Sequence, residues 1–173
     1  MVIIPLVLLF VLISCSNQDV EKLHSRKGLP DQESWGVNII LTNQGLMRAK
    51  VKSGYLKKYN AKDYIILDSN VTVDFFDKNE KHTSILTSNQ AEVDQSSNNM
   101  IAKGNVIATS DSGIALFSEK LNWNAKEEKL QTKEKIMITT IDKDTLYGIG
   151  FESDSDLKNW TIINPSGITG KDF

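Results

Sequence analysis

The chain has 173 residues, of which 40% are hydrophobic and 24% charged, with 20 basic and 22 acidic side chains and a formal net charge of -2. Such a composition is typical of one soluble domain, and the nearly neutral charge gives no long-range field that would attract a polyanion, so we expect no nucleic-acid partner. The single cysteine, Cys15, excludes a disulfide within the chain and a zinc site built on paired cysteines.

The N-terminal segment reads as a lipoprotein signal. Residues 2–13 are uniformly apolar, but this run is shorter than the ~20 residues that a membrane-spanning helix needs. We therefore expect residues 1–14 to be a signal peptide. Leu12, Ile13, Ser14 and Cys15 resemble the bacterial lipobox, which makes Cys15 the predicted lipid attachment site and tethers the protein to a membrane.

A polar segment follows the predicted lipid anchor. Residues 15–34 contain Gly28 and Pro30 and show no sustained hydrophobic periodicity, so we expect a lipidated, flexible tether. Residues 35–173 then form the predicted domain.

The pattern of residues 35–173 predicts an all-β fold. Short runs alternate apolar and polar side chains, which is the period expected of half-buried strands, and no long stretch has helical spacing. We expect at most one helical turn, near Gln44 or Asp63. Residues typical of turns separate the predicted strands at 77–80, 95–99, 111–113, 125–128 and 142–144.

A repeat of 30 residues runs through this domain. Ser88, Ser118 and Gly148 have this spacing, as do Val93, Trp123 and Ser153, and each interval reads as strand, turn, strand. A unit of two strands cannot bury its apolar face alone, so the copies must stack over a shared core. The repeat favours an elongated, twisted β-jellyroll of repeated antiparallel strand pairs with open ends over a closed barrel.

The sequence offers little catalytic chemistry. Of the two histidines, His24 lies in the predicted tether and His82 on a predicted strand, far from any nucleophile. Gly148 and Gly150 lack the third glycine and the helix of a nucleotide-binding loop. Acidic pairs such as Glu92 with Asp94 lie among turn-forming residues, as solvated edges do. We expect no enzyme activity, no catalytic residue, no cofactor and no metal site.

The apolar positions have two interpretations that the composition leaves open. Three tryptophans and six phenylalanines are ordinary core material. Alternatively, the two faces of the sheet do not close fully, and the inward positions line a groove for acyl chains.

The C-terminal half resembles the LptC family of the lipopolysaccharide export machinery. The resemblance rests on the stretches 118–123 and 147–154, on the closing 160–162, and on four residues between the first two stretches: Leu130, Thr132, Ile136 and Ile138. It extends over about residues 35–168 and implies a twisted β-jellyroll, like that of LptA. It also implies a non-enzymatic protein that receives lipopolysaccharide from the ABC transporter LptBFG and passes it to an LptA-like bridge protein.

The resemblance turns two sets of residues into expectations. By analogy, an N-terminal strand edge faces the transporter and a C-terminal edge meets the bridge protein by strand addition. The expected edge residues are Val37, Ile39, Leu41, Trp160, Ile162 and Ile163. The expected lining of the acyl-chain groove is Val71, Val73, Phe75, Val93, Leu121, Trp123, Ile136, Ile138 and Phe151.

The expected location is the periplasm, with the lipid anchor in the periplasmic face of the inner membrane in preference to the outer membrane, which stays the alternative. Many LptC proteins keep an uncleaved transmembrane helix where this chain has a lipobox. Two competing hypotheses are a scaffolding envelope lipoprotein with a closed β core and no lipid ligand, and a lipoprotein hydrolase that would bring His82 together with a serine or aspartate.

Overall fold

The computed structural model describes residues 28–166, which form nine β-strands and one short 3-10 helix, η1, at Asn60–Lys62. The strands, all longer than five residues, are β1 Gln32–Asn43, β2 Leu46–Tyr59, β3 Tyr64–Phe76, β4 His82–Asp94, β5 Met100–Ser110, β6 Ala115–Asn124, β7 Lys129–Thr139, β8 Thr145–Asp154 and β9 Trp160–Pro165.

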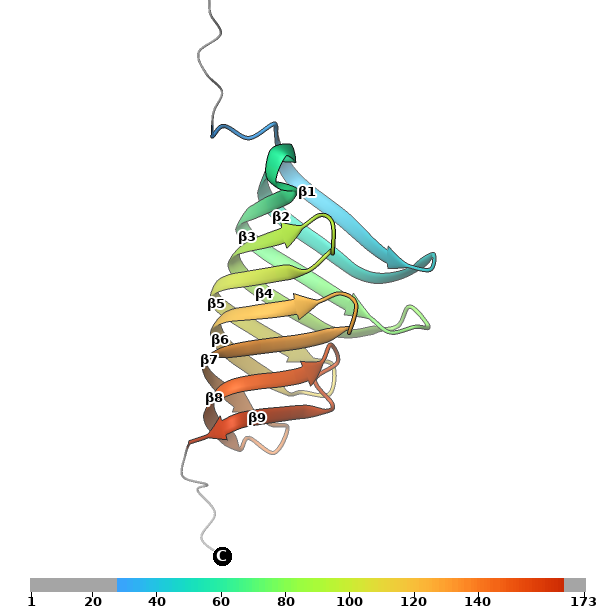
Figure 1. The fold of residues 1–173 in the computed structure, drawn as a ribbon. Coiled ribbons are helices and arrows are strands. Elements are labelled where there is room, and N and C mark those ends of the chain that lie inside the picture. Colours follow the sequence, from blue (N-terminus) through green and yellow to red (C-terminus); the bar gives the residue numbers. More distant parts are fainter. Residues whose placement is uncertain (1–27, 167–173) are drawn as a thin grey trace, which may run out of the picture.

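These strands form one antiparallel sheet in which each strand pairs with its neighbours in sequence order, from β1 to β9. The sheet does not close, because within residues 28–166 β1 pairs only with β2 and β9 only with β8. Figure 1 shows the strands stacked along one axis with β1 and β9 at opposite ends. The prediction of an all-β, open-ended, jellyroll-like stack is confirmed.

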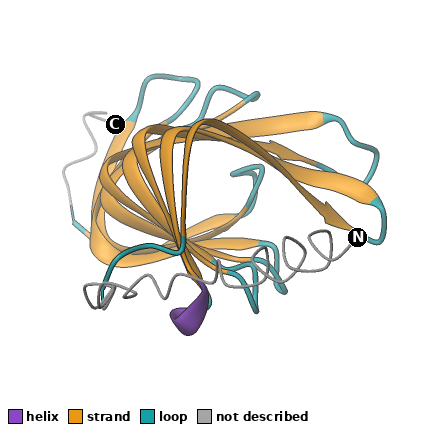
Figure 2. Cartoon of the chain, turned by 90° about the horizontal axis from the view of Figure 1, so that it is seen from above, coloured by secondary structure: helices purple, strands orange, loops and turns teal. Residues whose placement is uncertain are grey.

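Each strand bends midway, so that the sheet folds over on itself (Figure 2). The bends coincide with a row of register shifts, for example between Lys52 and Tyr55 in β2 and between Lys103 and Val106 in β5. We call the two halves arm 1 and arm 2, and the space between them the trough. Arm 1 comprises 37–53, 71–87, 106–118, 135–149 and 164–165, and arm 2 comprises 32–35, 55–68, 90–103, 120–132 and 151–162.

The bends explain the repeat in the sequence. Val71 pairs with Ser88, Val106 with Ser118, and Ile136 with Gly148, so equivalent residues of the repeat lie opposite each other beside successive bends. The extra residues of a bulge leave backbone groups without strand partners.

Serine hydroxyls compensate for this loss at three bends. The hydroxyl oxygens of Ser53, Ser88 and Ser118 each lie within 3.1 Å of the carbonyl oxygen two residues later. Ser53 Oγ also lies 2.7 Å from the carbonyl oxygen of Asp68 on the neighbouring strand and accepts from its amide at 3.2 Å. We call Ser53, Ser88 and Ser118 the bend serines. They satisfy buried backbone groups where the ladder is interrupted.

The inner faces of both arms form one hydrophobic core. It includes Val51 and Leu56 of β2 and continues to Phe151 of β8. The predicted alternation explains this arrangement, because every second side chain of a strand points to the same face.

The strand boundaries agree closely with the turns read from the sequence. The five predicted turns all lie between strands, and η1 ends beside Asp63, one of the two positions expected for a helical turn. One boundary differs, because residues 32–34, expected in the tether, pair with β2 as the start of β1. The predicted signal peptide and Cys15 lie outside the described residues.

Candidate functional site

The trough contains all nine residues expected to line a groove. Eight of them are between 0 and 7% exposed, and Val93 is partly buried against the same core. They come from β3, β4, β6, β7 and β8, so the apolar lining extends along most of the stack. Contact of these side chains with acyl chains stays a prediction.

The two arms touch through aromatic rings in the middle of the trough. The ring of Phe75 on arm 1 and that of Trp123 on arm 2 have centroids 4.9 Å apart and planes inclined by 50°. At this contact β3 of arm 1 therefore faces β6 of arm 2. Side chains fill the centre of the trough, and any long guest must displace them or part the arms.

The trough opens at one side through a pocket of about 570 Å³, which we call the mouth. The mouth lies between the β1–β2 hairpin of arm 1 and the β4–β5 and β6–β7 turns of arm 2. Leu41, Ala49 and Trp123 supply its apolar wall. The polar and charged side chains that also line it are Thr42, Asn43, Arg48, Ser97, Asn98, Lys126 and Glu128.

An ion pair crosses the mouth. Arg48 Nη2 of β2 lies 2.5 Å from Glu128 Oε2 in the β6–β7 turn, and the two side chains are 19% and 36% exposed. Glu80 joins the same region, because its Oε1 accepts the amide of Met47 at 2.8 Å. The backbone amide of Lys81 holds the pKa of nearby Asp77 below its ordinary value, and the charge of Arg48 acts in the same direction.

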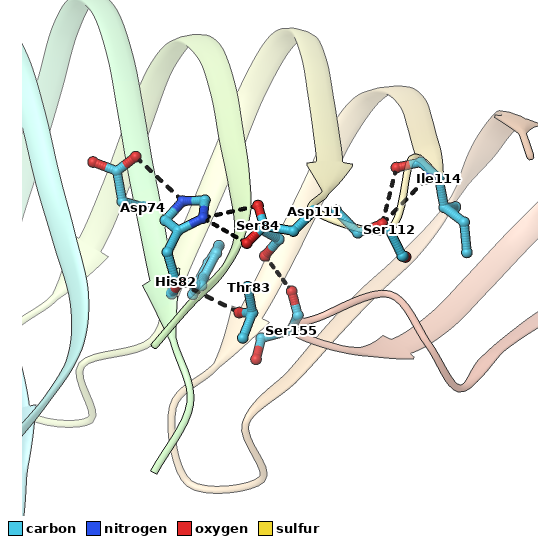
Figure 3. Close-up of polar contacts among 10 residues, drawn as sticks. Asp74, His82, Thr83, Ser84, Asp111, Ser112, Ile114 and Ser155 are labelled. Carbon is cyan, nitrogen blue, oxygen red and sulfur yellow. Dashed lines mark hydrogen bonds and ion pairs between the residues drawn. The ribbon is translucent and has the colours of Figure 1, made fainter. Parts of the chain in front are cut away.

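Further along the stack the β8–β9 turn closes the trough. Ser84 of arm 1 donates a hydrogen bond to the carbonyl oxygen of Ser155 in this turn (Figure 3). Leu157, at the tip, is fully buried in the core and has a positive φ of 57°. The turn is therefore pinned across the trough by one hydrogen bond and one apolar side chain.

His82, two residues before Ser84 on β4, lies between two carboxylates. Its Nδ1 lies 2.9 Å from Asp111 Oδ1, and its Nε2 lies 3.7 Å from Asp74 Oδ1 (Figure 3). Ser84, the nearest serine of the strand, directs its hydroxyl to Ser155. The clustering of His82 with carboxylates matches part of the hydrolase hypothesis, but the serine hydroxyl has a different partner.

The far end of the trough has a second opening of about 550 Å³, between β8 of arm 1 and β9 of arm 2. Leu146, Trp160 and Ile162 supply its apolar wall. Trp160 and Ile162, two of the expected edge residues, also pack against the core. Their side chains thus face the trough while their backbones form the last strand of the sheet.

The remaining expected edge residues divide between the two faces. Val37, Ile39 and Leu41 on β1 are partly buried and pack against the core, so they extend the apolar lining to the first strand. Ile163 on β9 is 59% exposed and points away from the core. Strand addition would use the backbone N–H and C=O groups of β1 and β9, which form the two edges of the sheet within residues 28–166.

Sequence reasoning missed three features of the site: the Arg48–Glu128 pair, the buried Leu157 and the bend serines. The sequence contains a signal for each of these three features. Arg48 is one of only two arginines in the chain, Leu157 is an isolated apolar residue in the polar run 152–159, and the repeat marked Ser88 and Ser118 as recurrent small residues.

Two other kinds of site are absent from the part of the chain that the structure describes. Among residues 28–166, no group of three or more His, Cys, Asp or Glu side chains is placed to hold a metal ion. In the same residues, no helix has the length and apolar character needed to cross a membrane.

Comparison with known proteins identifies the family. Residues 2–166 match the family model described as "Lipopolysaccharide-assembly, LptC-related". The chain belongs to this LptC family. Membership gives it a role in lipopolysaccharide transport. No curated protein matches the chain.

The solved structures similar to the chain include LptH of Pseudomonas aeruginosa, described as the LptA-homologous periplasmic component of the conserved lipopolysaccharide transport device. The identity is 10%, the TM-score is 0.49, and the match covers 66% of this chain and 80% of LptH.

Proposed function

We propose that this LptC-family chain shelters the acyl chains of lipopolysaccharide between its two arms and passes the lipid along the stack. The single observation that supports this most is the apolar inner face, which extends from Val37 on β1 to Ile162 on β9. Within residues 28–166 these first and last strands each have one edge without a pairing partner. This role requires binding and release alone, and we propose no enzyme activity.

The physical need for such a shelter is large. Each methylene exposed to water costs about 0.8 kcal/mol, so a lipid with several long acyl chains does not cross an aqueous compartment unprotected. The trough would take the chains on its inner face. The charged sugar and phosphate groups would remain at the mouth and in solvent.

The two sheet edges would connect the chain to its neighbours. An LptBFG-like ABC transporter would dock at the β1 edge, beside Val37, Ile39 and Leu41, and supply lipopolysaccharide from the membrane. An LptA-like bridge protein would add its strand to β9, beside Trp160, Ile162 and Ile163. Strand addition would then align the troughs of successive proteins into one apolar path.

The same proposal includes a location. A lipidated Cys15 would anchor the chain to the periplasmic face of the inner membrane, with residues 15–34 as the connection to the sheet. Two or more acyl chains on the anchor would hold it stably, where a single chain would not.

Site-specific photo-crosslinking tests the proposal. A photoreactive residue at Trp123 or Phe151, on the inner face, should form an adduct with lipopolysaccharide in membranes supplied with ATP. Phe117 is the matched aromatic control, because its side chain lies on the outer face of arm 1, beside Ile107 and Met137. Absence of adducts at every inner position, or equal adducts at inner and outer positions, would refute the proposal.

The filled centre of the trough also favours a second candidate, a scaffolding envelope lipoprotein without a lipid ligand. In that case Phe75 and Trp123 would stay in contact under all conditions. Depletion of the protein distinguishes the candidates, because loss of a lipid carrier leaves newly made lipopolysaccharide in the inner membrane, whereas loss of a scaffold does not.

A further inference from the structure

The mouth of the trough combines an apolar wall with a basic rim. Trp123 and Leu41 lie on its apolar side, whereas Arg48 and Lys126 carry positive charge at its border. An amphiphile with an anionic head group and apolar chains has the complementary chemistry. This inference rests on the proposed function and concerns how its ligand enters.

The guanidinium of Arg48 already has a partner in the structure. Glu128 contacts it from the opposite arm, 80 residues later in the chain. The ion pair therefore joins the arms at the mouth, beside the apolar wall that an acyl chain would have to reach. Within residues 28–166 Arg48 is the only arginine, whereas Lys126 is an exposed lysine in the turn that carries Glu128.

We propose that Arg48 is the residue that binds a phosphate group of the entering lipid, and that Glu128 holds the mouth closed until that phosphate replaces it. The Arg48–Glu128 pair thus acts as a latch. An arginine forms paired hydrogen bonds with phosphate oxygens as readily as with a carboxylate. The exchange releases arm 1 from the β6–β7 turn and exposes Trp123 to the acyl chains.

The geometry makes this exchange feasible. Both partners of the pair are partly exposed, and an ion pair in contact with water contributes little net stability. A doubly charged phosphate therefore competes well with the single carboxylate. Lys126 adds a second positive charge next to Glu128. The charge of Arg48 also lowers the pKa of Asp77, but Asp77 lies on the same arm as Arg48 and does not bridge the mouth.

The latch makes a prediction that a purely structural ion pair does not. Glu128→Gln and Arg48→Gln break the same pair, so a structural role would shift both variants in the same direction. As a latch and phosphate site, the pair should give opposite shifts. Glu128→Gln should bind phosphorylated lipid A more tightly than the unmodified protein, and Arg48→Gln should bind it about tenfold more weakly.

The test is a titration of the full chain and its variants with lipid A micelles, followed by tryptophan fluorescence. Dephosphorylated lipid A is the ligand control. Because it lacks the phosphate that replaces Glu128, it should bind Glu128→Gln and Arg48→Gln with equal affinity, and at least as tightly as it binds the unmodified protein. The matched protein control is the Lys103–Glu92 pair, whose nitrogen and oxygen lie 2.7 Å apart and whose side chains are 37% and 36% exposed. Glu92→Gln and Lys103→Gln should leave the affinity unchanged.

Each other outcome has a definite meaning. If the unmodified protein binds neither form of lipid A, the proposed function fails and the latch with it. If it binds lipid A but both variants shift together, or neither shifts, the latch is refuted and the proposed function stands. If inorganic phosphate alone produces the same fluorescence change, Arg48 is a site for free phosphate and not an entrance for lipid.

Discussion

Phe75 and Trp123 meet across the trough although they are 48 positions apart in the sequence, with ring centroids 4.9 Å from each other. The contact holds arm 1 to arm 2 at the centre of the molecule. Phe75 is 1% exposed and Trp123 is 7% exposed, so both rings contribute fully to the core. Any opening of the trough has to separate this pair.

Replacing Phe75 with alanine should therefore destabilise the fold strongly. Deletion of a buried phenylalanine ring costs about 3 to 5 kcal/mol in unfolding free energy. Tyr147→Ala, at a position 49% exposed on the outer face, should change it by less than about 0.5 kcal/mol. Urea unfolding monitored by circular dichroism measures both. Equal losses for the two variants would show that the arms are not packed through Phe75.

The bend serines make a separate prediction. Ser53→Ala removes a hydroxyl that contacts backbone groups of Tyr55 and Asp68, which leaves buried polar groups without partners. We expect a loss of about 1 to 3 kcal/mol in unfolding free energy, measured by urea denaturation. Ser34→Ala on β1 is the control, because its hydroxyl accepts only from the exposed side chain of Gln32. An unchanged unfolding midpoint in Ser53→Ala would contradict the role assigned to the bend serines.

The sequence predicted the inner face well because alternation in a strand leaves few choices. Val71, Val73 and Phe75 alternate along one strand and therefore lie on one face of it, so if one of them points to the core, the others do too. Where both faces carry apolar residues the pattern is ambiguous, as at 65–67. There the structure places Ile65 and Leu67 toward the core and Ile66 on the outer face of arm 2.

The contacts between the arms could not be predicted in this way. They depend on how far the twist of the sheet offsets one arm from the other, and no local pattern encodes this offset. Arg48 and Glu128 meet only because β2 of arm 1 faces the β6–β7 turn of arm 2. Leu157 reads as part of an exposed turn until the β8–β9 turn is seen folding across the trough.

The β4–β5 turn at the rim of the mouth should respond to acid. The hydroxyl of Ser96, which donates to Asp94 Oδ1 at 2.6 Å, lowers the pKa of Asp94 to about 2, with the backbone amide of Ser97 acting in the same sense. Because the folded pKa lies below the ordinary value of 3.8, the stabilisation is complete above about pH 4 and disappears as the pH falls through about 2.

Amide resonances of the turn provide the measurement. The amides of Ser96 and Ser97 should shift with a midpoint near pH 2. Asp94→Asn should abolish this titration, and Asp142→Ala, in the exposed β7–β8 turn, should leave it intact. A midpoint near 3.8 would show that the hydrogen bonds from Ser96 and Ser97 do not favour the charged carboxylate.

The lack of a side chain at Gly148 should be what allows β9 to pair closely with β8. A Cβ at this position would overlap Ile162 Cγ2 and lie 2.8 Å from the backbone oxygen of Asn164, and both groups belong to β9. Gly148→Ala should therefore push β9 away from β8 without disturbing the core further up the stack. Hydrogen exchange should accelerate in β9 and remain slow in β3 and β4.

A second change separates this steric effect from a general loss of stability. Ile162→Ala removes the Cγ2 atom that the new methyl group would meet, so the double variant should recover part of the protection of β9, limited by the remaining contact with Asn164. Ile149→Ala, next to Gly148 but with its side chain exposed on the outer face, should leave β9 protected. Faster exchange over the whole sheet in Gly148→Ala would contradict the prediction. If β9 receives an LptA-like strand, the same variant should lose that partner while it still binds lipid A, because the mouth lies near the other end of the stack.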